Sequence, residues 1–184
     1  MRAQINNKAK RKVIHEGRFL RFVRKGEWEY TQRNNCNAIV IIAALTEDEH
    51  VIFVEQYRLP VDRIVIEFPA GLVNDRGQKK LESVLSAAKR EFLEETGYQA
   101  KKWVKILDGP VSSGSSADLI TLFLAYDARK IAEGGGDDLE SITVHSIPIE
   151  RVDQWLTKMK SKGRLVEPKI YTGLYFLKTY NRGS

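Results

Sequence analysis

Two apolar runs in the first third of the chain most restrict how it can fold. Residues 37–45 read NAIVIIAAL and residues 50–58 read HVIFVEQYR, and only the polar turn TEDE separates them. Runs this rich in β-branched residues are typical of strands that are buried within a sheet. The chain must therefore build a sheet that other elements cover, and its 184 residues are enough for one well-buried core.

The order of the remaining elements predicts an α/β protein. Short alternating pieces between residues 11 and 34, punctuated by Gly17 and Gly26, indicate a meander of three antiparallel strands. A helix is expected at 81–96. Further strands are expected at 63–68, 103–107, 119–127 and 141–147, and helices at 149–161 and 168–180. We expect a mixed β-sheet with helices packed against it, preceded by a small β-appendage.

Composition excludes several classes of protein. The single Cys36 rules out an internal disulfide framework and favours a reducing compartment, so the cytoplasm is the expected location. No stretch reaches the roughly 18 apolar residues of a membrane span, and the basic N-terminus lacks the apolar segment of a secretion signal. The net charge of +6 suits an anionic partner, but the basic residues are scattered, which favours a small anionic substrate over nucleic acid.

The helix expected at 81–96 carries acids at the end where they are least favourable. Glu91, Glu94 and Glu95 fall in its last turns, before Gly97, a residue typical of helix C-termini. The helix dipole disfavours each carboxylate there by roughly a few tenths of a kcal/mol. At about 100° per residue, Glu91 and Glu95 border an apolar stripe formed by Leu81, Val84, Leu85, Ala88 and Phe92.

These acids have more than one interpretation. They could form a solvated face, or Lys and Arg from elsewhere could neutralise them. Convergent carboxylates at the edge of a buried surface are also what a hard divalent cation needs, since Mg²⁺ takes oxygen ligands.

The stretch around REFLEETGY resembles the Nudix box, G-x5-E-x7-R-E-U-x-E-E-x-G-U, in which U is aliphatic or aromatic. The matching positions are Glu82, Arg90, Glu91, Phe92, Glu94, Glu95, Gly97 and Tyr98. The leading glycine of the box would fall at Arg76. Instead, Gly71 in EFPAG resembles that glycine as it occurs in the branch that hydrolyses ADP-ribose and other nucleotide sugars, with a loop five residues longer before Glu82.

The resemblance implies a fold and a division into domains. The fold would be the Nudix fold, an α/β/α sandwich with a mixed β-sheet, plus a small N-terminal antiparallel β-appendage. Residues 1–36 would form the appendage and residues 37–184 the catalytic domain. In this branch the appendage implies a homodimer formed by exchange of the appendage.

The resemblance also implies roles for the box residues. Glu91, Glu95 and the backbone carbonyl of Ala70 would bind more than one Mg²⁺ ion, or Mn²⁺ in its place. Glu94 would be a further ligand or a base for metal-bound water. Arg90, with Glu82, would orient these carboxylates.

Three residues outside the box are candidates for binding substrate. Arg58, in EQYRLP, is either a phosphate contact or a surface arginine. Glu67 ends a strand and would engage a ribose hydroxyl or a structural partner. Trp28 in the appendage would stack on the nucleobase, or belong to the core or to a dimer interface.

The stretch AEGGGDDLESITV at 132–144 combines a glycine run with several acids. Three consecutive glycines give the backbone freedom, and the stretch could be a solvated acidic loop. In the nucleotide-sugar branch a mobile loop here carries a glutamate that acts as general base or binds metal, for which Glu140 is the first candidate and Asp138 the second.

The expected activity is Mg²⁺-dependent hydrolysis of the diphosphate bond of nucleoside diphosphate sugars. ADP-ribose would give AMP and ribose 5-phosphate, and GDP-mannose and related compounds are further candidates. One alternative is a Nudix pyrophosphatase for a nucleoside triphosphate or a dinucleoside polyphosphate. Another is a non-catalytic Nudix-like module that binds nucleotide or RNA, which the complete set of box acids disfavours.

Overall fold

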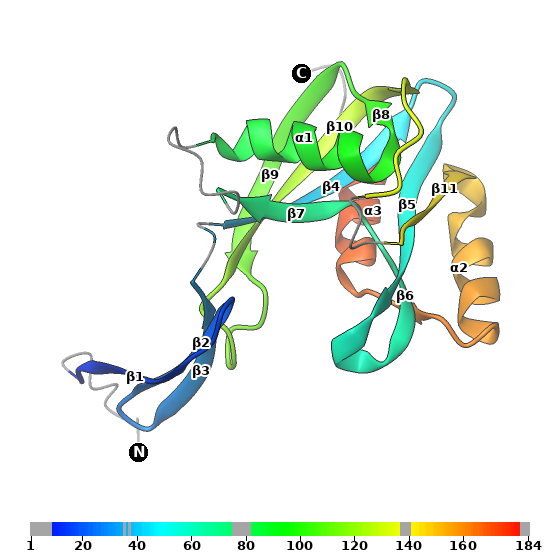
Figure 1. The fold of residues 1–184 in the computed structure, drawn as a ribbon. Helices are drawn as coiled ribbons and strands as arrows, with labels where there is room; N and C mark the ends of the chain where they lie inside the picture. The colour runs from blue at the N-terminus through cyan, green and yellow to red at the C-terminus, as the bar shows by residue number, and fades with distance from the viewer. Residues whose placement is uncertain (1–8, 35, 37, 75–81, 137–140, 181–184) are drawn as a thin grey trace.

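The computed structural model describes residues 9–34, 36, 38–74, 82–136 and 141–180. These residues form a layered α/β body and a small separate sheet (Figure 1). The strands are β1 (Arg11–Glu16), β2 (Leu20–Lys25), β3 (Trp28–Arg33), β4 (Ala38–Thr46), β5 (His50–Arg58), β6 (Arg63–Glu67), β7 (Ala70–Val73), β8 (Tyr98–Gln99), β9 (Lys102–Pro110), β10 (Leu119–Lys130), β11 (Thr143–Pro148) and β12 (Leu165–Val166). The α-helices are α1 (Val84–Thr96), α2 (Val152–Ser161) and α3 (Lys169–Thr179).

The large sheet of the described residues is mixed. Its strands follow the order β12-β6-β5-β4-β10-β8, with β11 beside β5, β7 beside β4 and β9 beside β10. The pairs β4–β10 and β6–β12 are parallel, whereas β4–β5, β4–β7, β5–β6, β5–β11 and β9–β10 are antiparallel. This topology confirms the predicted fold class.

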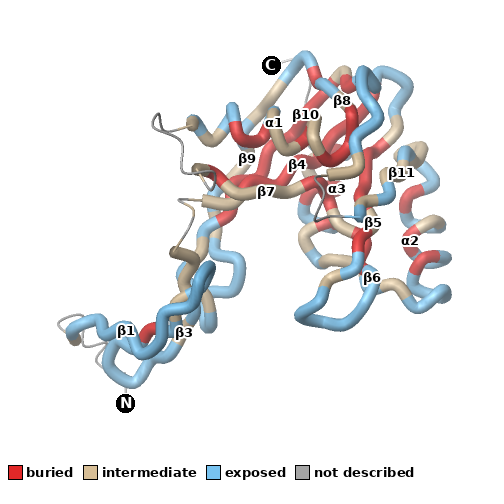
Figure 2. The backbone as a smooth tube through the Cα atoms, in the orientation of Figure 1, coloured by how far each residue is buried: buried red, intermediate tan, exposed pale blue. Residues whose placement is uncertain are grey.

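Strand β4 lies at the centre of the body and is buried on both faces. Its side chains alternate between the two core clusters, because successive residues of a strand point to opposite sides. Ile41, Ala43 and Leu45 pack with residues of α2 and α3, while the alternate residues pack with α1. Figure 2 shows the buried residues concentrated along the central strands. The result is a sandwich in which α1 covers one face of the sheet.

Local signals fix the ends of α1. The Ser83 side chain accepts a hydrogen bond from the backbone N–H of Ser86 at 3.1 Å and caps the first turn. Gly97 ends the helix with φ of 74°, as predicted. The predicted buried face is partly wrong, since Leu85 is 37% exposed; Leu81 lies outside the described residues.

Within the described residues, no helix is long and apolar enough to cross a membrane.

The N-terminal sheet meets the body through an edge of β3. The backbone N–H of Thr31 donates to the carbonyl of Ser115, and that of Ala117 donates to the carbonyl of Thr31, both at 2.9 Å. The Asp118 carboxylate accepts the backbone N–H of Arg33 at 3.0 Å. The predicted three-stranded appendage is therefore present, and the 111–118 loop holds its last strand.

Close packing between α3 and the sheet leads to a first prediction. A Cβ added at Gly173 would overlap the Phe68 ring and lie 2.9 Å from the Cβ of Ala43. Gly173→Ala should therefore lower the free energy of unfolding by about 1–3 kcal/mol through overpacking. Urea denaturation measures the loss, with the exposed neighbour Thr172→Ala as the control. Equal stability of the two variants would contradict the prediction.

Candidate functional site

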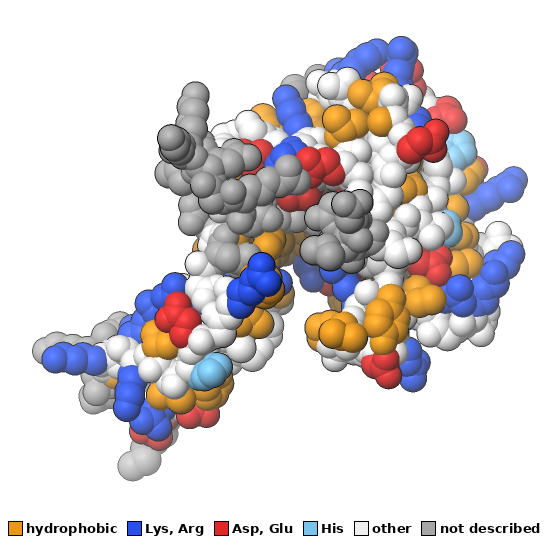
Figure 3. Space-filling model, in the orientation of Figure 1, with side chains coloured by type: hydrophobic (Ala, Val, Ile, Leu, Met, Phe, Trp, Pro, Cys, Tyr) orange, Lys and Arg blue, Asp and Glu red, His pale blue; other side chains and the backbone are white. Residues whose placement is uncertain are grey.

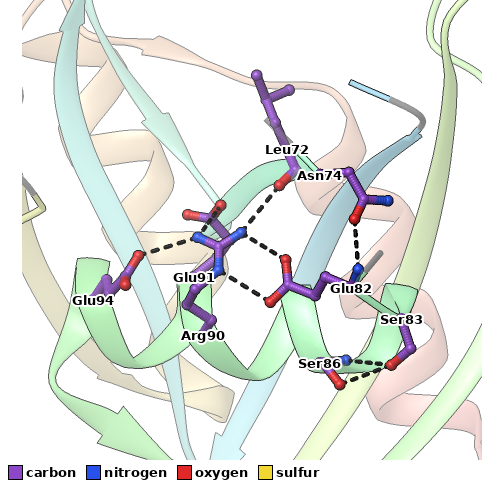
Figure 4. A network of polar contacts seen from close by, with 8 residues as sticks. All are labelled: Leu72, Asn74, Glu82, Ser83, Ser86, Arg90, Glu91 and Glu94. Atoms are coloured by element: carbon purple, nitrogen blue, oxygen red, sulfur yellow. Dashed lines mark hydrogen bonds and ion pairs between the residues drawn. The ribbon is translucent and has the colours of Figure 1, made fainter. Parts of the chain in front are cut away.

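Arg90 lies at the centre of a polar network on α1 (Figure 4). Its guanidinium binds the Glu82 carboxylate with two hydrogen bonds of 3.1 Å. It also donates to Glu91 at 2.8 Å, to Glu94 at 3.2 Å and to the backbone carbonyl of Leu72 at 3.1 Å. The planar fork of arginine suits this arrangement, because its several N–H donors point in fixed directions.

The network is largely shielded from solvent. The side chains of Arg90, Glu82 and Glu91 are 16%, 14% and 13% exposed, and that of Glu94 is 37% exposed. Burial alone would lower the pKa of Arg90, but its hydrogen bonds to Glu82 and the charge of Glu91 outweigh burial and raise the pKa above its ordinary value. Arg90 therefore stays charged and holds the surrounding acids in place.

Two of the acids meet the backbone of β7. Glu95 is only 4% exposed, and its carboxylate accepts the N–H of Ala70 at 3.2 Å. The carboxyl end of Glu91 lies against Gly71, where an added Cβ would overlap it. Glu91 and Glu95 therefore converge on Ala70 and Gly71, and glycine at 71 makes the close approach possible.

Residues on either side of segment 75–81 are also tied together. The side-chain oxygen of Asn74 accepts the backbone N–H of Glu82 at 2.5 Å. Asn74 has φ of 62°, in the left-handed region that asparagine tolerates better than most residues. Asn74 and the carbonyl of Leu72 support the network, and the sequence analysis did not identify either one; an asparagine just after EFPAGLV was the available signal.

The structure pairs two of the predicted substrate-binding residues with each other. The Nε of Arg58 donates to Glu67 at 2.7 Å. Trp28 lies on β3 and is 64% exposed, so of the alternatives for Trp28 only a place in the core of this chain is wrong. Glu140, the predicted base, lies outside the described residues, as does Asp138.

The strand that follows residue 140 is anchored by a second charged group. The His145 ring lies 2.7 Å from one oxygen of Glu55, and Arg164 donates to the other at 3.1 Å. Burial raises the pKa of Glu55, but the hydrogen bonds from His145 and Arg164 outweigh burial and bring the pKa below its ordinary value. This contact fixes β11 against β5 on the side of α2.

The acids of α1 have the right chemistry for a divalent cation. Carboxylate oxygens are the ligands that Mg²⁺ and Mn²⁺ prefer, and Figure 3 shows acidic side chains gathered over α1. Among the described residues, no three Asp, Glu, His or Cys side chains form a ready-made metal-holding group. The carboxylate oxygens therefore suit a divalent cation as ligands. Because the guanidinium of Arg90 contacts both Glu91 and Glu94, these two side chains would have to move before they could share a cation.

The fold and the site together define an α/β sandwich whose helix α1 presents a buried arginine–carboxylate network to a glycine-bearing strand. The family model described as NUDIX domain matches residues 36–167. The chain belongs to the Nudix family, and this confirms the resemblance of the box.

The relatives of the chain include two named pyrophosphatases. An ADP-ribose pyrophosphatase of Bacillus subtilis is 34% identical over 112 residues, which are 60% of this chain and 58% of that protein. A GDP-mannose pyrophosphatase of Cronobacter sakazakii is 30% identical over 130 residues, 64% of this chain and 65% of that protein. The chain thus spans less than two thirds of the length of either relative.

A solved structure shares the whole fold. The structure titled "Crystal structure of ADP compounds hydrolase" matches with a TM-score of 0.68 and covers 95% of this chain and 92% of that chain. Its sequence is 19% identical, so the match establishes the fold alone.

Proposed function

We propose that this chain is a Mg²⁺-dependent hydrolase of the diphosphate bond in nucleoside diphosphate sugars, with ADP-ribose giving AMP and ribose 5-phosphate. The observation that carries the proposal is the group of acids on α1 of a Nudix domain. Arg90 binds Glu91 and Glu94, and Glu95 contacts Ala70 in the EFPAG segment. The relatives named for ADP-ribose and GDP-mannose support this substrate class. Mn²⁺ would serve in place of Mg²⁺, and the cytoplasm remains the proposed compartment.

The residues of α1 would hold the metal and the diphosphate. Glu91, Glu95 and the carbonyl of Ala70 would bind the cations, with Glu94 as a further ligand or as the acceptor of a proton from metal-bound water. When bound, Mg²⁺ would neutralise the diphosphate oxygens and lower the pKa of a coordinated water. Arg90 would keep neighbouring carboxylates oriented, as its short contacts to Glu91 and Glu94 suggest.

The reaction adds one water across the anhydride. The water oxygen forms a bond to one phosphorus while the bridging P–O bond of the diphosphate breaks. One proton of the water passes to the base, for which Glu140 stays the first candidate and Asp138 the second. Arg58, held by Glu67, is the proposed phosphate contact, because a guanidinium binds phosphate oxygens with paired hydrogen bonds.

A product-resolved assay tests the proposed function. The protein is incubated with ADP-ribose, GDP-mannose or dGTP in Mg²⁺, and the nucleotide and sugar products are separated and counted. We expect ADP-ribose to be hydrolysed fastest, with AMP and ribose 5-phosphate in equal amounts and no turnover in EDTA. Fastest turnover of dGTP would favour a nucleoside triphosphate pyrophosphatase. No turnover of any compound would favour a binding module.

Gly71 provides a prediction about the same site. In Gly71→Ala the added Cβ overlaps the carboxyl end of Glu91, so this proposed ligand must move. Misplacing a metal ligand by about 1 Å should lower kcat on the order of 10²-fold. Gly114→Ala is the control, since no atom lies within 4 Å of its added Cβ. Equal kcat in both variants would show that the contact between Gly71 and Glu91 does not matter for catalysis.

We also propose that the N-terminal sheet forms a homodimer interface. Within the described residues, most of this sheet is exposed, and it carries the exposed apolar residues Val13, Ile14, Phe19, Leu20, Phe22 and Trp28. Figure 3 shows the appendage projecting from the body with apolar and basic side chains on its surface. A small sheet needs a hydrophobic face or packing against another element to be stable on its own, and a second copy of the sheet would cover these apolar residues. Light scattering should give twice the monomer mass; a monomer would remove the dimer and the role of Trp28 at its interface.

A further inference from the structure

The glycine run between β10 and β11 contacts the end of α1 that carries the acids. We call Gly134, Gly135 and Gly136 the glycine clasp. The N–H of Gly135 donates to the backbone carbonyl of Glu95 at 2.8 Å, and the N–H of Gly136 donates to that of Glu94 at 3.2 Å. The clasp thus binds the backbone of the two residues whose side chains lie at the proposed metal site.

These bonds complete the C-terminal cap of α1. The last carbonyls of a helix have no partner within the helix. Here the N–H of Gly97 binds the carbonyl of Leu93 at 2.8 Å, and the clasp binds the next two carbonyls along the chain. The carbonyl of Gly97 in turn accepts the N–H groups of Ile131 and Ala132 at 2.8 and 3.0 Å. The segment before the clasp and the clasp itself therefore wrap around the helix end.

The backbone of the clasp favours glycine at all three positions. The φ angles of Gly134, Gly135 and Gly136 are 75°, 113° and 82°, in the region that favours glycine. A Cβ on Gly134 would also overlap the carbonyl group of Thr96 and the nitrogen of Gly97. The sequence predicted that this run gives backbone freedom, but in the structure the glycines permit a close contact with α1.

The position of the clasp has a consequence for the acids. The last turn of α1 contains no basic residue, so its negative end and its carboxylates would favour fraying. Backbone N–H groups that bind the carbonyls of Glu94 and Glu95 fix the backbone at both residues. A fixed backbone limits the positions that each carboxylate can occupy. A metal site needs this restriction, because its ligands must converge on one cation.

We propose that Gly134, Gly135 and Gly136 are positioning residues that hold the last turn of α1 so that the carboxylates of Glu94 and Glu95 are placed at the divalent-cation site. The proposal rests on the proposed function, which places Glu94 and Glu95 at the metal site, but its test by Mn²⁺ binding needs no hydrolysis of a substrate. It assigns the glycine run a role at the metal site through the helix backbone.

The test compares two alanine variants that carry the same backbone strain. Gly134→Ala adds strain and a collision with α1. Gly163 has φ of 78°, close to the 75° of Gly134, so alanine at either position carries a similar backbone strain. At Gly163, however, no atom lies within 4 Å of the added Cβ. Mn²⁺ binding to the 184-residue proteins is measured by electron paramagnetic resonance without substrate. The Mg²⁺ dependence of ADP-ribose hydrolysis is measured in parallel.

We expect Gly134→Ala to weaken Mn²⁺ binding by about tenfold or more, as loss of support behind metal ligands usually does. The Mg²⁺ concentration for half-maximal rate should rise by a similar factor, while KM for ADP-ribose at saturating Mg²⁺ changes by less than about threefold. Gly163→Ala should stay within about twofold of the wild type, because Gly163 lies between α2 and β12 and its added Cβ meets no atom within 4 Å. Equal Mn²⁺ affinity of the two variants would overturn the proposal.

A second variant covers the case in which Gly134→Ala does not fold. Gly135→Ala meets no atom within 4 Å, so its strain at φ of 113° acts on the clasp alone and should weaken Mn²⁺ binding in the same direction. Wild-type affinity in Gly135→Ala would then overturn the proposal. A wild type that binds Mn²⁺ but hydrolyses no nucleotide would overturn the proposed function and leave the role of the clasp supported by the binding result. A wild type that binds no Mn²⁺ would overturn both.

Discussion

Glu95→Gln is expected to lower kcat for ADP-ribose at saturating Mg²⁺ by at least about 100-fold, while the protein stays folded. Removing groups that only support metal ligands costs about 10–100-fold, so loss of a ligand charge should cost at least the upper end of that range. The fold should tolerate the change, because the glutamine oxygen can still accept the N–H of Ala70 that Glu95 now accepts. Glutamine also removes a buried negative charge from the C-terminal end of α1.

Two measurements separate loss of function from loss of fold. Thermal unfolding in EDTA should show Glu95→Gln at least as stable as the wild type, whereas the stabilisation of the wild type by Mg²⁺ should be absent from the variant. Glu47→Gln is the matched control, since Glu47 pairs with the exposed residues Lys101 and Arg129 and has no contact with Arg90 among those given for the described residues. Undiminished Mg²⁺-dependent turnover by Glu95→Gln would refute the assignment of Glu95 as a ligand.

The sequence predicted the main elements of the fold because their patterns are local. The β-branched runs became β4 and β5, and the glycine after the acids ended α1. Strand β7 was not predicted, since Pro69 and Gly71 within PAGLV indicate a loop. Its strand conformation comes from antiparallel pairing with β4, a partner distant in sequence. Strands β8 and β12 have two residues each, too few for any periodicity.

The candidate site was predictable to the extent that one helix carries it. Helical periodicity placed Glu95 near the edge of the buried face, and Glu95 is buried in the structure. Periodicity failed for Leu85, because α1 starts at Val84 and its first turn is less covered than its middle. The glycine clasp could not be predicted, because its hydrogen bonds join segments about 40 residues apart in the chain.

Arg90→Met is expected to give the largest loss of stability. Arg90 is the shared partner of Glu82, Glu91 and Glu94, and methionine has a similar length but no donor. Breaking a buried ion pair by removing one partner usually costs about 3–5 kcal/mol, because the remaining charge is left without compensation. Urea denaturation in EDTA should show a loss of this size for Arg90→Met. Arg129 forms an exposed ion pair with Glu47 and serves as the control. Arg129→Met should lower the free energy of unfolding by no more than about 1 kcal/mol.

Adding Mg²⁺ then distinguishes a metal site from a purely structural network. If the acids bind the cation, Mg²⁺ can replace part of the missing positive charge, so the stability deficit of Arg90→Met should shrink as Mg²⁺ is added. Binding to the folded state alone stabilises by about 2.7 kcal/mol at a ligand concentration of 100 Kd. A deficit that does not change with Mg²⁺ would mean that Arg90 serves only to neutralise the acids. Arg90 would then account for acids at a helix C-terminus without any metal, because the guanidinium alone offsets the charges that the helix dipole disfavours.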